Sequence, residues 1–309
     1  MVSTNPGRRR GLGRRIWAAR ELYLLLLIPL VWYAVFRYAP LYGIQIAFRD
    51  YRPARGFWGS TWVGMRHFTR FFNSFYCERV ISNTLIINFA SLLIGFPVPI
   101  LFALMLNEIK QERYKKLLQN VTYIPHFLST VVLVSILQLI FNHNTGVYNS
   151  LRKLFGLETT NYFAMASAFK PMYILSGLWQ NMGWDSILYI AALAGIDPAL
   201  YEAATIDGAT RMQKIRFISI PSIMGTITIM LLLRCGQIMN IGYEKVLLMQ
   251  NGLNQSSSDV ISTYVYRVGM LEGNYSYSTA INLFNSLCNI VLLSSANLLS
   301  RKMGGNSLW

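Results

Sequence analysis

The chain has 309 residues, of which 53% are hydrophobic and 13% are charged, and its mean hydropathy is +0.36. This composition excludes an ordinary soluble domain, because the apolar residues gather in runs of roughly 20, the length that a helix needs to cross a bilayer. The formal net charge of +15 does not indicate nucleic-acid binding here, since basic residues beside apolar runs are typical of contacts with anionic lipid headgroups.

The apolar pattern predicts an all-α, polytopic membrane protein in which residues 1–20 are a basic cytoplasmic segment and residues 21–309 form a single domain. We expect six transmembrane helices, at about residues 21–47, 81–107, 118–141, 172–194, 218–241 and 278–300. Pro29 and Pro40 predict a kink or break in the first span. Asn, Ser, Gly and Pro inside most spans are expected to face other helices or a wet cavity.

The distribution of Lys and Arg predicts the orientation. With the N-terminus in the cytoplasm, the inner segments 1–20, 108–117, 195–217 and 301–309 hold fifteen of the 28 basic residues. Eleven more are spread over the much longer outer segments 48–80, 142–171 and 242–277. The positive-inside rule therefore places both termini in the cytoplasm. The outer segments either cap the spans or form a platform for an extracytoplasmic binding protein.

A polar segment, residues 197–217, separates the fourth and fifth expected spans and predicts a helical hairpin. Asp197 and Pro198 suit the start of a helix, and Gly208 suits the left-handed residue that ends one. A second helix is then expected to reach a boundary at Ile220-Pro221, where the fifth span begins. From the residues alone, the hairpin is either a handle that another protein grips or a re-entry loop with ordinary caps.

The spacing of this segment is informative. The run Glu202-Ala203-Ala204-Thr205-Ile206-Asp207-Gly208-Ala209, followed by Ile218-Ser219-Ile220-Pro221, resembles the cytoplasmic coupling motif of binding-protein-dependent ABC importer permeases. Ile220 stands where the family usually has Leu, an exchange of one apolar residue for another. The resemblance implies the type I ABC importer transmembrane fold. It also implies that a helix carrying Glu202, Ala203, Ala204, Asp207, Gly208, Ala209 and Pro221 docks on a separate ATPase subunit.

Other segments resemble the carbohydrate branch of this family, in particular the permeases for alginate and rhamnogalacturonan oligosaccharides. They are Leu27-Ile28-Pro29, Pro40-Leu41-Tyr42-Gly43, Asn83-Thr84-Leu85, Tyr123-Ile124-Pro125-His126-Phe127, Trp179-Gln180-Asn181-Met182-Gly183-Trp184 and 191–198. The resemblance implies a multi-pass permease in a bacterial cell membrane. Its expected partners are a second homologous permease, in a heterodimer rather than a homodimer, two ATPase subunits that bind ATP and Mg, a solute-binding protein and an oligosaccharide.

Polar residues at helical spacing indicate faces that avoid lipid and could line a substrate path. Amide side chains suit hydroxyl-rich sugars, and aromatic rings stack on their apolar faces. The candidates are Asn181, Trp184, Arg234, Gln237, Asn240, Asn282 and Asn285. The alternative for each is interhelical packing by hydrogen bonds. Arg234 is costly in a span, and no acidic residue within a span is an obvious partner, so it is expected to meet a partner chain or an anionic sugar.

The sequence lacks the motifs of several kinds of catalytic and metal site. The sequence contains no Gly-x-x-x-x-Gly-Lys-Ser/Thr loop, no zinc-type spacing of Cys and His, and no Ser-His-Asp arrangement. We therefore expect a non-enzymatic chain without a cofactor or metal of its own, powered by another subunit. The alternatives are a permease of the same family for another small solute, or an ion-driven secondary transporter. The second would need an internal repeat and membrane-embedded acidic residues.

Overall fold

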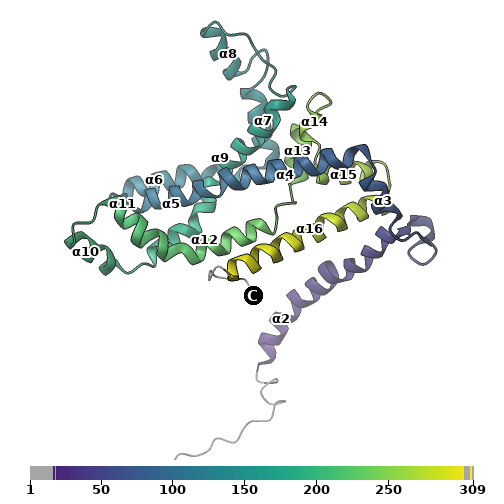
Figure 1. The fold of residues 1–309 in the computed structure, drawn as a ribbon, viewed down its shortest axis with the longest axis horizontal. Helices are drawn as coiled ribbons and strands as arrows, with labels where there is room; N and C mark the ends of the chain where they lie inside the picture. Colours follow the sequence, from purple (N-terminus) through teal and green to yellow (C-terminus); the bar gives the residue numbers. More distant parts are fainter. Residues whose placement is uncertain (1–16, 18, 303–306, 308–309) are drawn as a thin grey trace, which may run out of the picture.

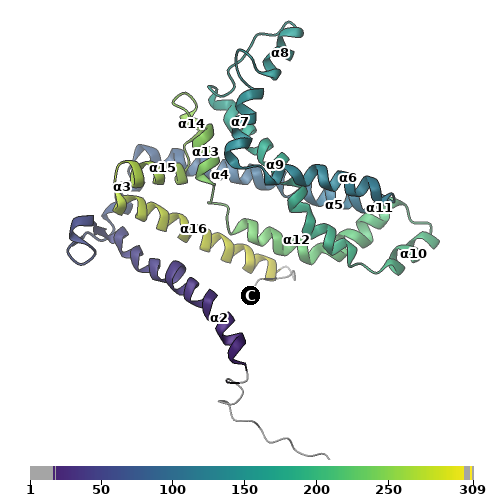
Figure 2. The ribbon, with the colours of Figure 1, turned by 180° about the vertical axis from the view of Figure 1, so that it is seen from behind.

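The structure is a computed structural model that describes residues 17, 19–302 and 307 (Figure 1). The arginines of the predicted basic segment, Arg8, Arg9, Arg10, Arg14 and Arg15, lie outside these residues. Most of the long helices run along one axis, with α10 (Pro198–Ile206) at one end and α3 (Arg66–Phe72) at the other (Figures 1 and 2). The protein therefore has two separate ends that can meet different partners.

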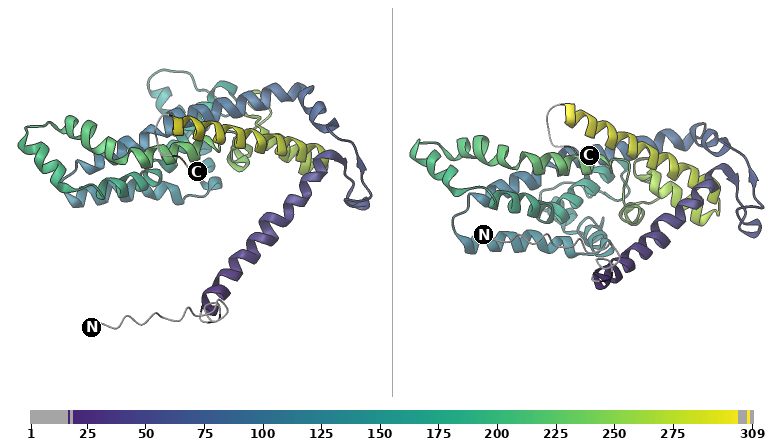
Figure 3. Two further views of the ribbon diagram at one scale, coloured as in Figure 1. Left: turned by 60° about the horizontal axis from the view of Figure 1, so that its bottom comes forward. Right: turned by 90° about the horizontal axis from the view of Figure 1, so that it is seen from below.

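The first predicted span is one helical stretch of 29 residues, Arg20–Phe48. It consists of α2 (Arg20–Tyr33), a π-helical turn η1 (Ala34–Tyr38) and a 3₁₀ segment η2 (Ala39–Phe48). The stretch therefore changes helix type but does not break at Pro29 or Pro40. No residue of α2 is buried, and Figure 3 shows α2 diverging from the bundle. In contrast, η2 packs against the C-terminal helix α16 (Tyr275–Lys302).

A small strand pair lies within the otherwise helical fold. Strands β1 (Arg49–Asp50) and β2 (Thr61–Trp62) pair antiparallel around the turn η3 (Pro53–Arg55), and α3 follows. The Arg49 side chain closes this turn, because its Nη1 donates to the Phe57 and Ser60 carbonyls at 2.9 and 3.0 Å. Helix α3 is the short helix of this outer segment.

The second span is confirmed as a continuous helix of 33 residues, α4 (Phe75–Gly95) followed by α5 (Pro97–Asn107). The third predicted span, 118–141, is wrong as a single straight helix. Helix α6 (Glu112–Tyr123) runs into the 3₁₀ turn η4 (Ile124–Phe127), and α7 (Thr130–Ile140) leaves at 100°.

The bend in the third span has a local cause. Pro125 has no N–H to donate, Leu128 is extended, and the Ser129 hydroxyl accepts from Val132 N at 3.3 Å, which starts a new helix. Gln180 of α9 (Ala166–Ala194) supports the bend by donating to the Leu128 carbonyl at 3.0 Å.

The fifth predicted span, 218–241, is shifted. Segments α11 (Arg211–Lys214), η5 (Ile215–Ser219) and α12 (Ile220–Cys235) form one helix of 25 residues, which begins before and ends before the prediction. The remaining elements are α8 (Val147–Leu154), α13 (Tyr243–Met249), α14 (Gln255–Ser258), α15 (Ile261–Tyr266) and η6 (Arg267–Leu271).

Four helices in the described part of the chain are long and apolar enough to cross a membrane, and two bent helix pairs raise the number to six. The bent pairs are α6–η4 with α7, and α9 with α10, which turns away by 71°. The polytopic helical prediction is confirmed. The predicted number of six spans is reached only if each bent helix pair is counted as one span.

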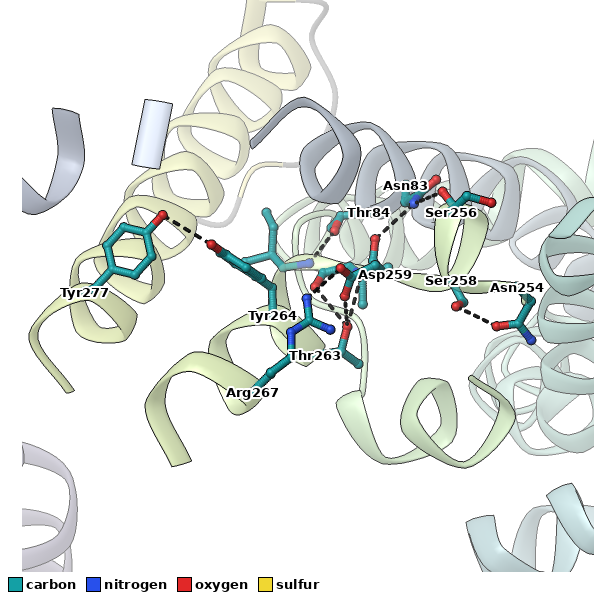
Figure 4. Close-up of polar contacts among 12 residues, drawn as sticks. Asn83, Thr84, Asn254, Ser256, Ser258, Asp259, Thr263, Tyr264, Arg267 and Tyr277 are labelled. Carbon is teal, nitrogen blue, oxygen red and sulfur yellow. Dashed lines mark hydrogen bonds and ion pairs between the residues drawn. The ribbon is translucent and has the colours of Figure 1, made fainter. Parts of the chain in front are cut away.

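The outer segment between α13 and α16 is fixed to α4 by a buried polar network (Figure 4). Asp259 is fully buried, and its Oδ2 pairs with Arg267 Nη2 at 2.7 Å. Asn83 Nδ2 donates to the Asp259 carbonyl, and Ile261 N donates to Thr84 Oγ1, each at 3.0 Å. A buried carboxylate persists only when it is paired in this way, so the network holds this outer segment in one position.

Candidate functional site

The hairpin expected after the fourth span forms from local signals. Asp197 Oδ1 accepts from Ala199 N at 2.9 Å and starts α10. Gly208 has a φ of +76° and ends the helix. Its N–H bonds the Thr205 carbonyl, while Ala209 N bonds the Ala204 carbonyl at 2.8 Å. This is the pair of bonds by which a left-handed glycine closes a helix.

The two arms of the hairpin are tied together. Lys214 Nζ donates to Thr205 Oγ1 at 2.6 Å, and the Tyr201 hydroxyl lies 2.9 Å from Ser219 Oγ. Thr210 and Gln213 form a reciprocal capping box at the start of α11. The hairpin is therefore a fixed projection at the end of the molecule (Figure 1).

Much of the surface of the hairpin is exposed. Glu202, Ala203, Asp207 and Gly208 are exposed, and Ala204 and Ala209 are half-buried. Large apolar side chains are exposed beside them, with accessible fractions of 87% for Ile206, 70% for Met212 and 68% for Phe217. Exposed apolar groups rimmed by polar ones mark protein contact surfaces.

The predicted boundary at Ile220-Pro221 is not present. Pro221 lies inside the continuous helix Arg211–Cys235, directly after the π-helical turn η5. A proline inside a helix removes one backbone donor, and a wider turn adjusts the backbone at such a point without ending the helix. Pro221 therefore lies near the start of the fifth span, outside the hairpin.

A cavity of about 460 Å³ lies between α4, α9 and the end of α12. Its polar wall comes from three separate parts of the sequence, which extend from Asn88 to Lys245. These are Asn88 and Ser91 of α4, Tyr173, Gln180, Asn181 and Asp185 of α9, and Arg234, Gln237, Asn240 and Lys245. Four of the seven predicted path residues, Asn181, Arg234, Gln237 and Asn240, are in this wall.

Arg234 has a partner within the chain, which corrects the expectation that no acidic residue is available. Its Nη2 pairs with Asp185 Oδ2 at 2.5 Å. Asp185 lies well inside α9, as the twentieth of its 29 residues. It therefore meets Arg234 across the cavity. The two residues are 49 positions apart, so only the packing of α9 on α12 brings them together.

Gln237 and Asn240 line the cavity for a different reason from the one predicted. They are not on a helical face, because α12 ends at Cys235 and the chain is irregular up to α13. Asn240 Oδ1 accepts from Asn285 Nδ2 and Asn289 Nδ2, each at 3.0 Å, and Asn289 Oδ1 accepts from Met239 N. Backbone freed by a broken helix must find such partners inside a membrane protein.

Three predicted path residues lie away from the cavity wall. Asn285 is buried in the contact with Asn240 and serves interhelical packing in this chain. Asn282 is exposed on α16. The Trp184 ring stacks on His126 at a centroid distance of 4.4 Å, and His126 Nδ1 lies 3.0 Å from Asn181 Oδ1, so this group braces the bend between α6 and α7.

Sequence reasoning missed Lys245, the other cation of the cavity. It belongs to α13, beyond the end of the fifth span, and its neighbours Val246, Leu247 and Leu248 give no polar periodicity that would have singled it out. Burial lowers the pKa of Lys245 to about 8. Nothing in the linear spacing relates it to Asn88 or Arg234.

The family described as "Binding-protein-dependent transport system inner membrane component" matches residues 95–305, which contain both the hairpin and most of the cavity wall. The chain belongs to this family. It is thus a multi-pass inner-membrane permease, a non-catalytic subunit of a binding-protein-dependent ABC importer whose ATPase resides on another subunit. The resemblance inferred from the coupling motif is confirmed.

Individual relatives are similar over almost the whole permease. Protein LplB of Bacillus subtilis (strain 168) is 42% identical over 93% of this chain and 91% of its own. The polygalacturonan/rhamnogalacturonan transport system permease protein YteP of the same organism is 39% identical over 94% and 90%. A chain of the bacterial alginate ABC transporter, crystallised with an alginate pentasaccharide-bound periplasmic protein, superposes with a TM-score of 0.89. It is 37% identical, with 97% of this chain and 100% of that one covered.

Proposed function

We propose that this permease imports oligosaccharides that contain acidic sugars. The observation that carries the proposal is the similarity along nearly the full length to two permeases whose names specify polygalacturonan or rhamnogalacturonan and alginate. Polygalacturonan, rhamnogalacturonan and alginate all contain sugars that bear carboxylates. The polar cavity supports the same substrate class, because amide groups of Gln180, Asn181 and Gln237 can bind sugar hydroxyls and two cations are present.

We infer that transport proceeds by alternating access in a larger assembly. The hairpin, with Glu202, Asp207 and Gly208 at its tip and apolar Ile206 beside them, suits docking on an ATPase subunit in the cytoplasm. This orientation puts both termini in the cytoplasm and the segment held by Asp259 outside, where a solute-binding protein would deliver the sugar. ATP and Mg belong to the ATPase subunits.

A second homologous permease, different in sequence, would complete the pathway. The cavity wall in this chain comes from α4, α9, α12, α13 and the segment between the last two, and forms one side of a path. Helix α2 supports an assembly too, because its apolar side chains are exposed along its length and it stands away from the bundle (Figure 3). Asn282, exposed on α16, would then face the interior of the assembly.

The test is to express the tagged chain with its native operon, purify it in mild detergent and identify the accompanying chains. We expect a second permease and two ATPase copies, and ATP hydrolysis that rises when a binding protein loaded with oligogalacturonate or oligoalginate is added. A lone chain that transports sugar without ATP would contradict the importer. Stimulation by neutral oligosaccharides alone would contradict the acidic substrate.

A further inference from the structure

The cavity wall carries more cationic than anionic side chains. It contains one carboxylate, Asp185, and two cations, Arg234 and Lys245. The carboxylate is already used, since it pairs with Arg234 at 2.5 Å. Across residues 19–302, the ion pairs join Arg52 to Asp50, Arg234 to Asp185 and Arg267 to Asp259, and none includes Lys245. The excess positive charge of the cavity therefore resides on Lys245.

The surroundings of Lys245 hold its ammonium in place without neutralising it. Nζ donates to the Tyr173 carbonyl at 3.1 Å and lies 4.6 Å from the centre of the Tyr173 ring. Gly177 lies beside it, and a Cβ at this position would be in ordinary contact with Nζ, at 3.4 Å. An ammonium has three protons to donate, and the hydrogen bond to the Tyr173 carbonyl uses one of them. Two remain for a ligand.

A second donor in the same cavity is also unused. Asn88 of α4 lines the wall, and its Nδ2 is buried without a hydrogen-bond partner. A buried amide donor left unpaired is costly, so this group also favours an occupant that supplies oxygen acceptors. Asn88 and Lys245 come from different helices, α4 and α13, and both leave a donor without an acceptor. A carboxylate group has the acceptor oxygens and the negative charge that match such a wall.

We propose that Lys245 is the specificity-determining residue of the translocation cavity, where its ammonium binds the carboxylate of an acidic sugar and Asn88 donates to the same sugar. Arg234 has the weaker claim, because it would first have to leave Asp185. This inference rests on the proposed function, the import of acidic oligosaccharides. It assigns the selection of the substrate by charge to one side chain of this permease.

The test compares two substrates in proteoliposomes that contain the full importer and its binding protein. One is oligogalacturonate and the other is the same oligosaccharide with its carboxylates methyl-esterified. For each substrate, the uptake rate with Lys245→Gln is divided by the rate with the wild type, so that any preference of the binding protein cancels. We expect about a tenfold selective loss for the acid, because one charge-assisted hydrogen bond is removed, and a ratio near one for the ester.

Two further variants separate charge from folding. Lys245→Arg keeps the cation and should restore most of the uptake of the acid. Lys170→Gln is the matched control, since Lys170 is a half-buried lysine on α9 that does not line the cavity, and it should change neither rate. Copurification of all subunits with Lys245→Gln verifies assembly, and if this variant does not assemble, Lys245→Arg against Lys245→Met gives the same comparison.

The outcomes are distinct. An equal loss for acid and ester, or no loss for either, would overturn the role of Lys245 and leave the importer assignment intact. A wild-type importer that transports the ester but not the acid, or neither sugar despite active ATP hydrolysis, would overturn the proposed substrate class and this inference with it. A selective loss for the acid, rescued by Lys245→Arg, supports both.

Discussion

The hairpin at 197–217 and the cavity between α4, α9 and α12 are built in opposite ways. Every group that shapes the hairpin lies within about 20 residues of its partner, from the Asp197 cap to the contact of Tyr201 with Ser219. The groups that shape the cavity come from positions as distant as Asn88 and Lys245. The hairpin is fixed by local backbone chemistry, whereas the cavity exists only after the helices have packed.

This difference shows which functional features can be predicted from the sequence. Capping residues and a left-handed glycine act on their own neighbours, so the hairpin keeps its shape whatever surrounds it. The pairing of Arg234 with Asp185 depends on how two helices are placed relative to each other. Substitutions should therefore separate the two regions: one set should uncouple ATP hydrolysis, and the other should change stability or substrate choice.

The largest effect is expected from Gly208→Val. Gly208 has a φ of +76°, a conformation that a β-branched residue adopts at a high cost, so the turn that directs the hairpin should change. We expect the sugar-stimulated ATPase activity of the assembled importer to fall roughly tenfold or more, as for loss of an allosteric coupling. Gly156→Val is the matched control, because Gly156 also has a positive φ, +70°, in open space on an outer turn. Equal loss in both variants would contradict a coupling role of the hairpin.

The next effect concerns the packing of α6 on α9. A Cβ at Gly183 would meet the Thr122 carbonyl oxygen at an impossibly short separation, and backbone cannot move aside as a side chain can. Gly183→Ala should therefore lower the free energy of unfolding by about 1–3 kcal/mol, measured by denaturant titration in detergent. Gly195→Ala, directly after the C-terminal end of α9 and with the nearest contact of a Cβ at 3.5 Å, should be nearly neutral. A stable Gly183→Ala variant would show that the helices can separate at this point.

A pH titration sharpens the contrast within the cavity. With its pKa lowered to about 8, Lys245 is charged below that pH and loses its proton as the pH rises through it. Uptake of an acidic oligosaccharide should therefore fall several-fold between pH 7 and pH 9, as the protonated fraction of Lys245 falls. The ionisable groups that line the cavity with Lys245 are Tyr173 and the Asp185–Arg234 pair, and its own helix adds Tyr243 and Glu244. Helix α13 also packs against α7, which has no ionisable residue, and against α15, whose ionisable residues are Tyr264 and Tyr266.

The control for this titration is Lys245→Arg, whose guanidinium stays charged over the whole range. The uptake rate of the wild type divided by that of this variant removes the pH dependence of the ATPase and the binding protein. A constant ratio from pH 7 to pH 9 would mean that the charge of Lys245 does not act on the substrate.

The smallest effect is expected from the Arg234–Asp185 pair. Its side chains are 51% and 26% exposed, so a double-mutant cycle with Arg234→Gln and Asp185→Asn should give a coupling energy of about 1 kcal/mol in unfolding. The Arg52–Asp50 pair is the comparison, since its atoms are 3.9 Å apart and both side chains are more than half exposed. Its coupling should be close to zero. Equal values for the two pairs would mean that Arg234 and Asp185 do not constrain α9 against α12.

The hairpin and the membrane class were predictable because their signals are contiguous. Apolar runs place helices from composition alone, and Asp197, Gly208 and the coupling motif mark the start, turn and identity of the hairpin. The bend in the third span was missed although Pro125 was visible, because a proline permits several outcomes and Gln180 of α9 selects one. The end of the fifth span at Cys235 was missed because its irregular continuation is held by Asn285 and Asn289 of α16.

The sequence by itself determined the membrane-spanning character, the positions of most helices and the hairpin, because hydrophobicity and capping act between residues that are close along the chain. The tertiary structure alone decided which polar residues share a cavity. It placed Asn285 in a packing contact and Arg234 in an ion pair with Asp185. Among the described residues, it paired Lys245 with no carboxylate. Such pairings depend on the relative placement of helices, which a spacing along one chain does not encode.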